Sequence, residues 1–342
     1  MSLPDLTQLT WKKIDSLPEL SGDYDDSAWV DADLEESFND KEPSITPVSL
    51  YADDYGFHTG TVLFRGHFTA NGEESTLNIT TSGGFSFGSS FWIGSTFLGS
   101  WDGIAHVPRN TTIFDLPSDL VKGNEYILTI VIDYMGLNGN YVIGEDTIKE
   151  PRGILDYDFA GHERSDITWK VTGNLGGEKY ADHVRGPLNE GGFFVERQGY
   201  HQPGPPSDDW EEGNPSEVIS KPGATFYTTT VDLDLPKGYD IPLAIKFDID
   251  AITAPTRVQI FVNGYQFGKF ASHLGPQWRF PVPEGILNHH GSNTIGILVW
   301  AQSEEGTQLK GFGWDVSMIT ATGYGEIGLT PAPEWEKRED AY

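Results

Sequence analysis

The sequence predicts an all-β protein made of two tandem jelly-roll β-sandwiches packed together. Its 342 residues include 40 Gly and 21 Pro, and 13% of them are aromatic, which is typical of many short strands joined by tight turns. We find no window of 11–18 residues with a helical period of apolar positions. An internal repeat of about 160 residues completes the case, because a period of this length is a whole domain rather than a solenoid unit.

The repeat is clearest where residues 92–101 (WIGSTFLGSW) align with residues 261–270 (FVNGYQFGKF), which places Gly99 on Gly268. Upstream of each copy stand a Trp-Lys pair, Trp11-Lys12 or Trp169-Lys170, and an acidic turn that ends in Trp29 or Trp210. We therefore expect two domains, 1–165 and 166–342, with the boundary just before the second Trp-Lys pair.

The elements follow in the same order in each copy. Strands are expected at 61–68 and 226–233, followed by hairpins with turns at Gly94-Ser95 and Asn263-Gly264. A Gly-first turn indicates type II′, and Asn-Gly is the strongest two-residue signal for a hairpin. The runs 127–132 and 295–300 are apolar on both faces, as in central strands of a sandwich. Helix is limited to single turns, such as 117–121 and 284–289.

Charge excludes several classes of function. The chain has 22 Lys and Arg against 51 Asp and Glu, a formal charge of −29, so it repels nucleic-acid phosphates and anionic lipid headgroups. No apolar run reaches the roughly 18 residues of a membrane span. There is no cysteine, which excludes thiol catalysis. Residues 1–5 lack the basic and apolar regions of a signal peptide, so we expect none in this chain.

Four carboxylates are candidates for catalysis, because glycoside hydrolysis needs only two of them at a defined separation. They fall in the middle of the chain, near several tyrosines: Glu145, Asp146, Glu163 and Glu196. The sequence leaves an alternative open, since so many acidic residues produce such groupings by chance. Glu163-Arg164 and Glu196-Arg197 also have the pattern of structural ion pairs.

Five aromatic residues are candidates for sugar binding, because a flat ring stacks on the apolar face of a pyranose while nearby polar groups bind its hydroxyls. They are Trp101, Trp210, Trp278, Tyr200 and His201. For Trp101 and Trp210, packing in a core or at a domain interface is the competing interpretation.

No cofactor or metal motif is present. His289 and His290 are adjacent and cannot chelate one ion from a strand, and the acidic run at 23–26 is an incomplete calcium loop. A structural calcium ion is compatible with so acidic a chain, but the sequence locates no site for it. The sequons at Asn78 and Asn110 are candidate glycosylation sites.

Several longer runs resemble the C-terminal jelly-roll region of the large fungal β-galactosidases of glycoside hydrolase family 35. The resemblance covers about residues 3–330, and its most specific strings are 152–155 (RGIL), 185–192 (RGPLNEGG), 196–203 (ERQGYHQP) and 280–288 (FPVPEGILN). It implies galactose-binding-like sandwiches, a secreted protein and a galactose-containing oligosaccharide or polysaccharide as partner. It also implies a (β/α)₈ catalytic domain elsewhere, because the catalytic glutamates of that family lie on a barrel for which this sequence has no counterpart.

Three functions remain open at this point. The chain is expected to be an accessory region with a structural role. The sequence leaves open whether this region also binds galactosides. The alternatives are a free-standing carbohydrate-binding protein and an enzyme, hydrolase or lyase, with its own carboxylate site at the junction of the sandwiches.

Overall fold

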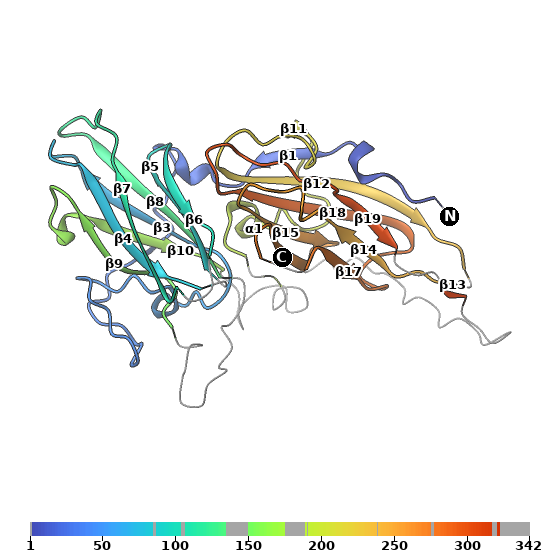
Figure 1. Ribbon diagram of the computed structural model, residues 1–342, viewed down its shortest axis with the longest axis horizontal. Helices are drawn as coiled ribbons and strands as arrows, with labels where there is room; N and C mark the ends of the chain where they lie inside the picture. The colour runs from blue at the N-terminus through green and yellow to red at the C-terminus, as the bar shows by residue number, and fades with distance from the viewer. Residues whose placement is uncertain are drawn as a thin grey trace. The chain divides into compact units, whose positions relative to one another are not determined.

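A computed structural model describes residues 2–84, 87–103, 107–134, 150–174, 189, 191–237, 239–274, 277–316 and 320–321. These residues form antiparallel sheets with a few short helical turns, which confirms the predicted all-β class (Figure 1). Glu145 and Asp146 lie outside the described residues.

The chain divides into two compact units. The N-terminal sandwich comprises Leu17–Gly176 and Glu190–Arg197, and the C-terminal sandwich comprises Met1–Ser16, Gly177–Asn189 and Gln198–Tyr342. This division differs from the expected boundary between residues 165 and 166.

The N-terminal sandwich has a six-stranded sheet, β2-β10-β3-β8-β5-β6, and a three-stranded sheet, β7-β4-β9. Its strands are β2 (Val30–Asp31), β3 (Val62–Thr69), β4 (Thr76–Ser82), β5 (Phe87–Ile93), β6 (Thr96–Trp101), β7 (Arg109–Asp115), β8 (Glu125–Tyr134), β9 (Ile154–Phe159) and β10 (Thr168–Thr172). Its helical turns are η2 (Pro18–Leu20), η3 (Ala52–Tyr55), η5 (Arg164–Asp166) and α1 (Phe194–Arg197).

The C-terminal sandwich repeats this plan with a six-stranded sheet, β11-β1-β12-β18-β15-β16, a three-stranded sheet, β17-β14-β19, and the pair β13-β20. Its elements are η1 (Leu6–Gln8), β1 (Lys12–Asp15), β11 (Glu211–Glu212), β12 (Gly223–Asp234), β13 (Tyr239–Asp240), β14 (Leu243–Lys246), β15 (Thr256–Val262), β16 (Tyr265–Ala271), β17 (Arg279–Val282), β18 (His290–Ala301), β19 (Gly313–Val316) and β20 (Thr320–Ala321).

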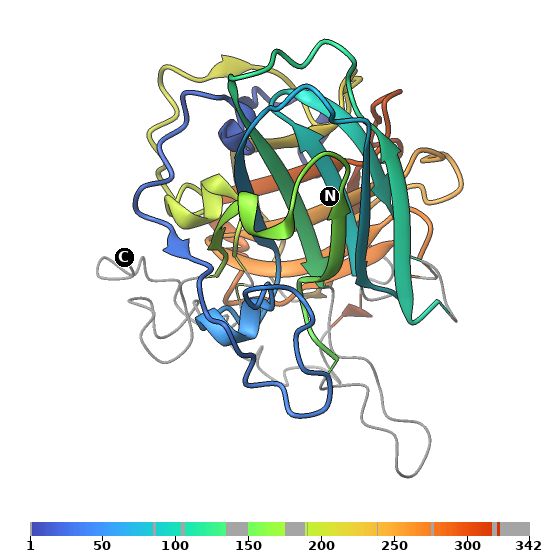
Figure 2. The same cartoon turned by 90° about the vertical axis from the view of Figure 1, so that its left-hand side faces the viewer.

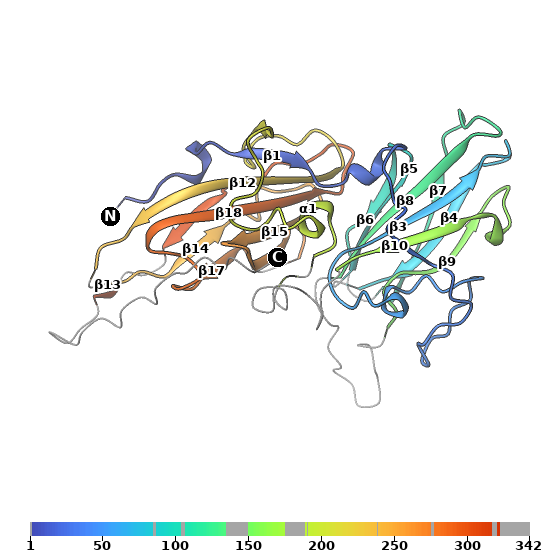
Figure 3. The same cartoon turned by 180° about the vertical axis from the view of Figure 1, so that it is seen from behind.

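The two Trp-Lys strands are exchanged between the repeats. β1 belongs to the first repeat by sequence but pairs with β12, with Lys12 opposite Thr228. β10 opens the second repeat but pairs with β3, with Lys170 opposite Arg65. Figure 3 shows β1, in blue, beside the yellow β12, whereas β10 lies beside β3. This reciprocal exchange is the reason that a boundary drawn before the second Trp-Lys pair separates strands that hydrogen-bond to each other.

Both hairpins have the expected turns. Asn263 (φ 49°) and Gly264 (φ 82°) are both left-handed, as type I′ requires. At the first hairpin Gly94 has φ 53° and Ser95 is not left-handed, as in type II′. β8 and β18 are central strands, also as predicted. Residues 117–121 and 284–289 form turns rather than helix, and the four-residue α1 was not predicted.

The repeated glycines mark an irregularity in each hairpin, where the register shifts between Phe91 and Trp92 and between Ile260 and Phe261. A Cβ atom on Gly99 would lie 2.7 Å from the Phe114 ring, and one on Gly268 would lie 2.2 Å from the Phe280 ring. Each bulge therefore brings the backbone close to a core phenylalanine, which explains why both copies have glycine there.

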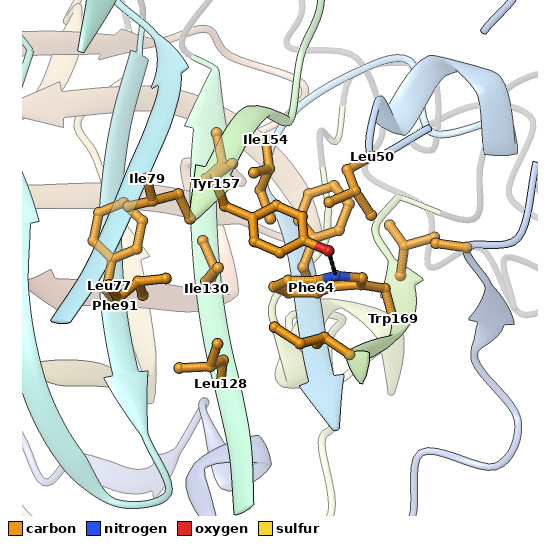
Figure 4. Close-up of a cluster of buried hydrophobic side chains, with 14 of the residues drawn as sticks. Leu50, Phe64, Leu77, Ile79, Phe91, Leu128, Ile130, Ile154, Tyr157 and Trp169 are labelled. Carbon is orange, nitrogen blue, oxygen red and sulfur yellow. Dashed lines mark hydrogen bonds between the residues drawn. The ribbon is translucent and has the colours of Figure 1, made fainter. Parts of the chain in front are cut away.

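Each sandwich encloses its own apolar core. In the N-terminal core Trp169 of β10 donates a hydrogen bond from Nε1 to the Tyr157 hydroxyl at 3.2 Å, beside Phe64 and Ile154 (Figure 4). In the C-terminal core Trp11 donates from Nε1 to the Leu6 carbonyl at 2.8 Å and is 1% exposed. The exchanged strands thus supply one buried tryptophan to each core.

Candidate functional site

A loop at residues 33–49 and the adjoining turn η3 form the frame of a surface cavity on the N-terminal sandwich. Figure 2 shows this segment, in blue, below the strands. The Ala52 amide donates to the Arg152 carbonyl at 2.7 Å, and the Ile154 amide donates to the Leu50 carbonyl at 3.0 Å. Gly153 (φ 147°) lies between them, and a Cβ there would come within 1.9 Å of the Leu50 carbonyl oxygen. Only glycine allows this approach. This accounts for the glycine in the Arg-Gly-Ile run, one of the strings by which the sequence resembles the β-galactosidase family.

Two neighbouring aspartates have different tasks in this frame. Asp54 holds the loop, since its Oδ1 accepts the Phe38 amide at 3.1 Å and its Oδ2 accepts the Ser49 hydroxyl. Asp53 Oδ1 lies 3.0 Å from His58 Nδ1 and 3.4 Å from Arg152 Nη1. Arg152 in turn packs over the Tyr134 ring at 4.2 Å. Asp53, His58 and Arg152 thus form a fixed, partly exposed polar group.

Phe38 stands beside this polar group with 79% of its surface exposed. The cavity has a volume of about 410 Å³, and we call it the Phe38 cradle. Its lining residues are Phe38, Asn39, Asp40, Asp53, Asp54, His58 and Arg152. An exposed ring next to hydrogen-bond acceptors and donors suits a ligand with one apolar face and a rim of hydroxyls.

The charges of the cradle further restrict its ligand. Three carboxylates face one guanidinium and one imidazole, so an anionic ligand would be repelled. Within the part of the chain that the structure describes, no group of three or more His, Asp or Glu side chains is placed to hold a metal ion. The cradle is therefore suited to direct hydrogen bonding with a polar ligand that is not an anion.

The two described carboxylates predicted for catalysis are not brought together in one pocket. Glu196 lies in α1, is 3% exposed and accepts the Phe193 amide at 3.2 Å. Glu163 caps η5, where it forms a reciprocal capping box with Asp166. The arginines that follow them pair elsewhere: Arg197 with Glu19 and Arg164 with Asp156. The structural interpretation of these pairs fits their observed contacts.

The predicted aromatic residues are dispersed. Trp101 is half-buried against the N-terminal core, and Trp210 packs on Tyr200 with ring centroids 5.4 Å apart. Trp278 is 41% exposed. His201 is buried, and its Nε2 lies 3.1 Å from the Asn189 amide nitrogen. Of these five side chains, Trp278 offers the most open ring to a ligand.

The two sequons lie on neighbouring strands. Asn78 is half-buried on β4, the middle strand of its sheet. Asn110 on β7 is 9% exposed, and its Nδ2 donates to the Thr112 hydroxyl at 3.1 Å. In the folded chain the Asn110 nitrogen is therefore already engaged.

Sequence reasoning missed Phe38, because a single aromatic residue in a polar loop has no strand or helix period around it. The available signal was its setting, an isolated ring within residues 35–42 (EESFNDKE), where no core strand is expected. Asp53 and His58 follow in and just after the adjoining turn η3, but Arg152 is more than 100 residues away, so the group gave no joint signal.

The fold is that of an all-β module, with a surface cavity on its loops and no catalytic barrel among its described residues. A family model described as "Beta-galactosidase second all-beta domain" matches residues 24–138 and 194–305. The chain belongs to this family.

Relatives that are about 50% identical in sequence support this assignment. The chain is 52% identical over 342 residues to beta-galactosidase A of Aspergillus oryzae and 49% identical over 343 residues to that of a Penicillium species. All of this chain is matched in both, but only 34% of each relative, so the chain spans about a third of their length.

Similar solved structures include a family 2 glycosyl hydrolase from Bacteroides cellulosilyticus, at a TM-score of 0.25 and 11% identity over 89% of this chain and 32% of that one. A family 2 beta-glucuronidase is similar at a TM-score of 0.24 and 13% identity, over 87% of this chain and 26% of that one. Among the described residues, no helix is long and apolar enough to cross a bilayer.

Proposed function

We propose that this chain is the accessory all-β region of a β-galactosidase and that it binds neutral, galactose-containing oligosaccharides in the Phe38 cradle. The observation that supports this most is Phe38 itself, 79% exposed beside the Asp53–Arg152 pair. A single exposed apolar residue is common on a protein surface, but Phe38 lines a cavity together with hydrogen-bonding side chains, which is the combination that a sugar-binding site needs.

The chemistry of the cradle fits a galactoside. The apolar face of the sugar ring would stack on Phe38, while Asp40 and Asp53 accept hydrogen bonds from hydroxyls. Arg152 and His58 would donate to ring or hydroxyl oxygens, because both side chains line the same cavity. In this proposal the cradle holds the saccharide, and bond cleavage takes place on a (β/α)₈ domain, the partner that the family resemblance implies. We further propose that the region acts outside the cell, which secretion of the protein from its native host would test.

The proposal is tested by titrating the full chain with galactobiose and longer β-galactan fragments by calorimetry. We expect Phe38→Ala to weaken binding at least tenfold and Asp53→Asn to weaken it severalfold. Ile45→Ala is the matched control, since Ile45 is another exposed apolar residue of the same loop, at 63%. Binding that is equal in wild type and Phe38→Ala, or absent at millimolar saccharide, would refute the cradle as a galactoside site.

A further inference from the structure

A second cavity, of about 190 Å³, lies on the N-terminal sandwich and shares no lining residue with the cradle. Its walls come from the segment 19–22, from β3, from the Gly94 turn and from β8. β3 and β8 pair directly, with Arg65 opposite Thr129 (Figure 3). We call it the Arg65 cavity.

Two fully buried charged side chains line this cavity. Glu19 is 0% exposed, and its Oε1 accepts a hydrogen bond from the Arg197 guanidinium. Arg65 is 1% exposed and donates from Nη1 to Asp26 Oδ2 at 2.5 Å. Both charges are thus compensated on one side and fixed in position.

Three buried polar atoms of the lining residues have no partner among the described residues. They are Glu19 Oε2, Arg65 Nε and Thr129 Oγ1. A buried polar atom without a hydrogen bond destabilises the folded state, and native proteins keep few of them. All three atoms belong to residues that line one cavity, so a group bound there could complete their hydrogen bonds after a small shift of these side chains.

We propose that the Arg65 cavity binds a small, neutral polyhydroxy ligand, no larger than one sugar ring. A hydroxyl group both donates and accepts, so it can satisfy a carboxylate oxygen, a guanidinium N–H and a threonine hydroxyl together. Glu19 and Glu125 disfavour an anion, and Arg65 disfavours a cation. The cavity is also smaller than the roughly 300 Å³ at which sites for drug-sized ligands begin, which limits the ligand to about one ring.

The lining has an apolar part as well. Ile127 of β8 is half-buried in its wall, on the same face of the strand as Thr129, where it can contact the C–H face of a small polyol. His67, which lies 2.7 Å from Asp26 Oδ2, is 35% exposed in its side chain. These features give the cavity a mixed surface independent of the cradle.

The test is a binding titration of the full chain with D-galactose and with glycerol, followed by ligand-observed NMR. Thr129→Val removes one unpartnered hydroxyl at constant shape, so it should leave folding intact and weaken galactose binding about tenfold. Phe38→Ala should leave this binding unchanged. Thr111→Val, on the exposed face of β7, is the matched control and should have no effect.

Each outcome bears on the proposal. Binding that is lost in Phe38→Ala and unchanged in Thr129→Val would assign all saccharide binding to the cradle and overturn the inference. A crystal structure with only water molecules on the three atoms, at saturating galactose, would overturn it too. Loss in Thr129→Val alone would support the Arg65 cavity even if the cradle binds no galactoside.

Discussion

The two sandwiches have the same order of strands, but the residue opposite the lysine of the exchanged strand differs between them. In the N-terminal sandwich Arg65 lies opposite Lys170, and the acidic turn supplies Asp26 as its buried partner. In the C-terminal sandwich Thr228 takes the corresponding position opposite Lys12. The tryptophans that end the two acidic turns are alike, since Trp29 packs on Tyr24 and Trp210 packs on Tyr200.

This contrast separates the features that the two copies share from a feature that one of them adds. Both copies keep the exchanged Trp-Lys strand, the central strand and the bulge glycine. Buried charge is added in one copy only at this position, and it lies beside a cavity that has unpartnered polar atoms. Both proposed ligand cavities lie on this N-terminal copy.

The largest effects are expected when the buried tryptophan of each exchanged strand is replaced by alanine. Trp11→Ala and Trp169→Ala should each cost about 3–5 kcal/mol in the free energy of unfolding, as for a large buried aromatic. Because the strands are exchanged, Trp11→Ala should loosen β12 and β18, while Trp169→Ala should loosen β3 and β8. Hydrogen exchange followed by mass spectrometry resolves these segments. Faster exchange in β3 after Trp11→Ala would contradict the exchanged pairing.

The second test compares Arg65 with Thr228. Arg65→Met leaves the buried Asp26 without its guanidinium, so it should cost about 3–5 kcal/mol, as when one partner of a buried ion pair is removed. Thr228→Val replaces a buried hydroxyl on the equivalent strand with a methyl group and should cost less than about 1 kcal/mol. Chemical denaturation measures both. Equal losses in the free energy of unfolding would show that the buried Arg65–Asp26 pair stabilises its sandwich no more than the Thr228 hydroxyl stabilises the other.

The third test concerns the bulge glycines. Gly99→Ala and Gly268→Ala should each cost about 1–3 kcal/mol, because the new methyl group forces Phe114 or Phe280 to shift. Gly313→Ala is the control, since a Cβ there meets no atom within 4 Å. Thermal unfolding of the three variants would settle whether the two bulges are equivalent; a neutral Gly268→Ala would mean that its core is looser.

The smallest expected difference is in pH dependence. Burial lowers the pKa of His289 from its ordinary 6.5, against the opposing effect of Glu284. Burial alone would raise the pKa of Glu74, but hydrogen bonds from the Asn71 amide, from its own amide and from His162 outweigh it and lower the pKa below 4.5. In both cases the pKa is lower in the folded state, so the unfolded state binds more protons than the folded state as the pH falls. Each group therefore stabilises the fold at neutral pH, and this contribution is lost on acidification.

The pH at which stability begins to be lost differs between the two sandwiches. Loss in the C-terminal sandwich begins as the pH falls below 6.5, and the Glu74 contribution in the N-terminal sandwich begins to be lost only below 4.5. We expect His289→Gln to flatten the decrease in Tm between pH 7 and pH 5, and Glu74→Gln to flatten it between pH 5 and pH 3. Unchanged pH profiles in both variants would rule out these two groups as the cause.

Much of the fold could be predicted because it depends on local patterns. The Asn263-Gly264 turn, the central strands and the glycine pair Gly99 and Gly268 all have signals within a few residues. The partner of a strand has no such signal: Trp11-Lys12 and Trp169-Lys170 look alike, and nothing in either run states which sheet it joins. The predicted boundary therefore followed the order of the repeats rather than their pairing.

The candidate sites were harder to predict for the same reason. The Phe38 cradle and the Arg65 cavity each combine segments that are distant in sequence, so their residues have no fixed spacing. The carboxylates Glu163 and Glu196 and the ring of His201 were conspicuous in the sequence but serve as a cap, a buried helix residue and a buried hydrogen-bonding group. Residue type alone did not distinguish a ligand contact from a structural one.

The exchanged strands also impose a delay on protein synthesis. Thr229 donates from its hydroxyl to the Thr10 carbonyl, 219 residues away along the chain. At about 5–20 residues per second, β1 is synthesised roughly 10–40 s before its partner. During that interval Trp11 has no core to enter, and the nascent chain must keep it from binding the wrong sheet. Slower translation should thus lower the folding yield of the C-terminal sandwich first.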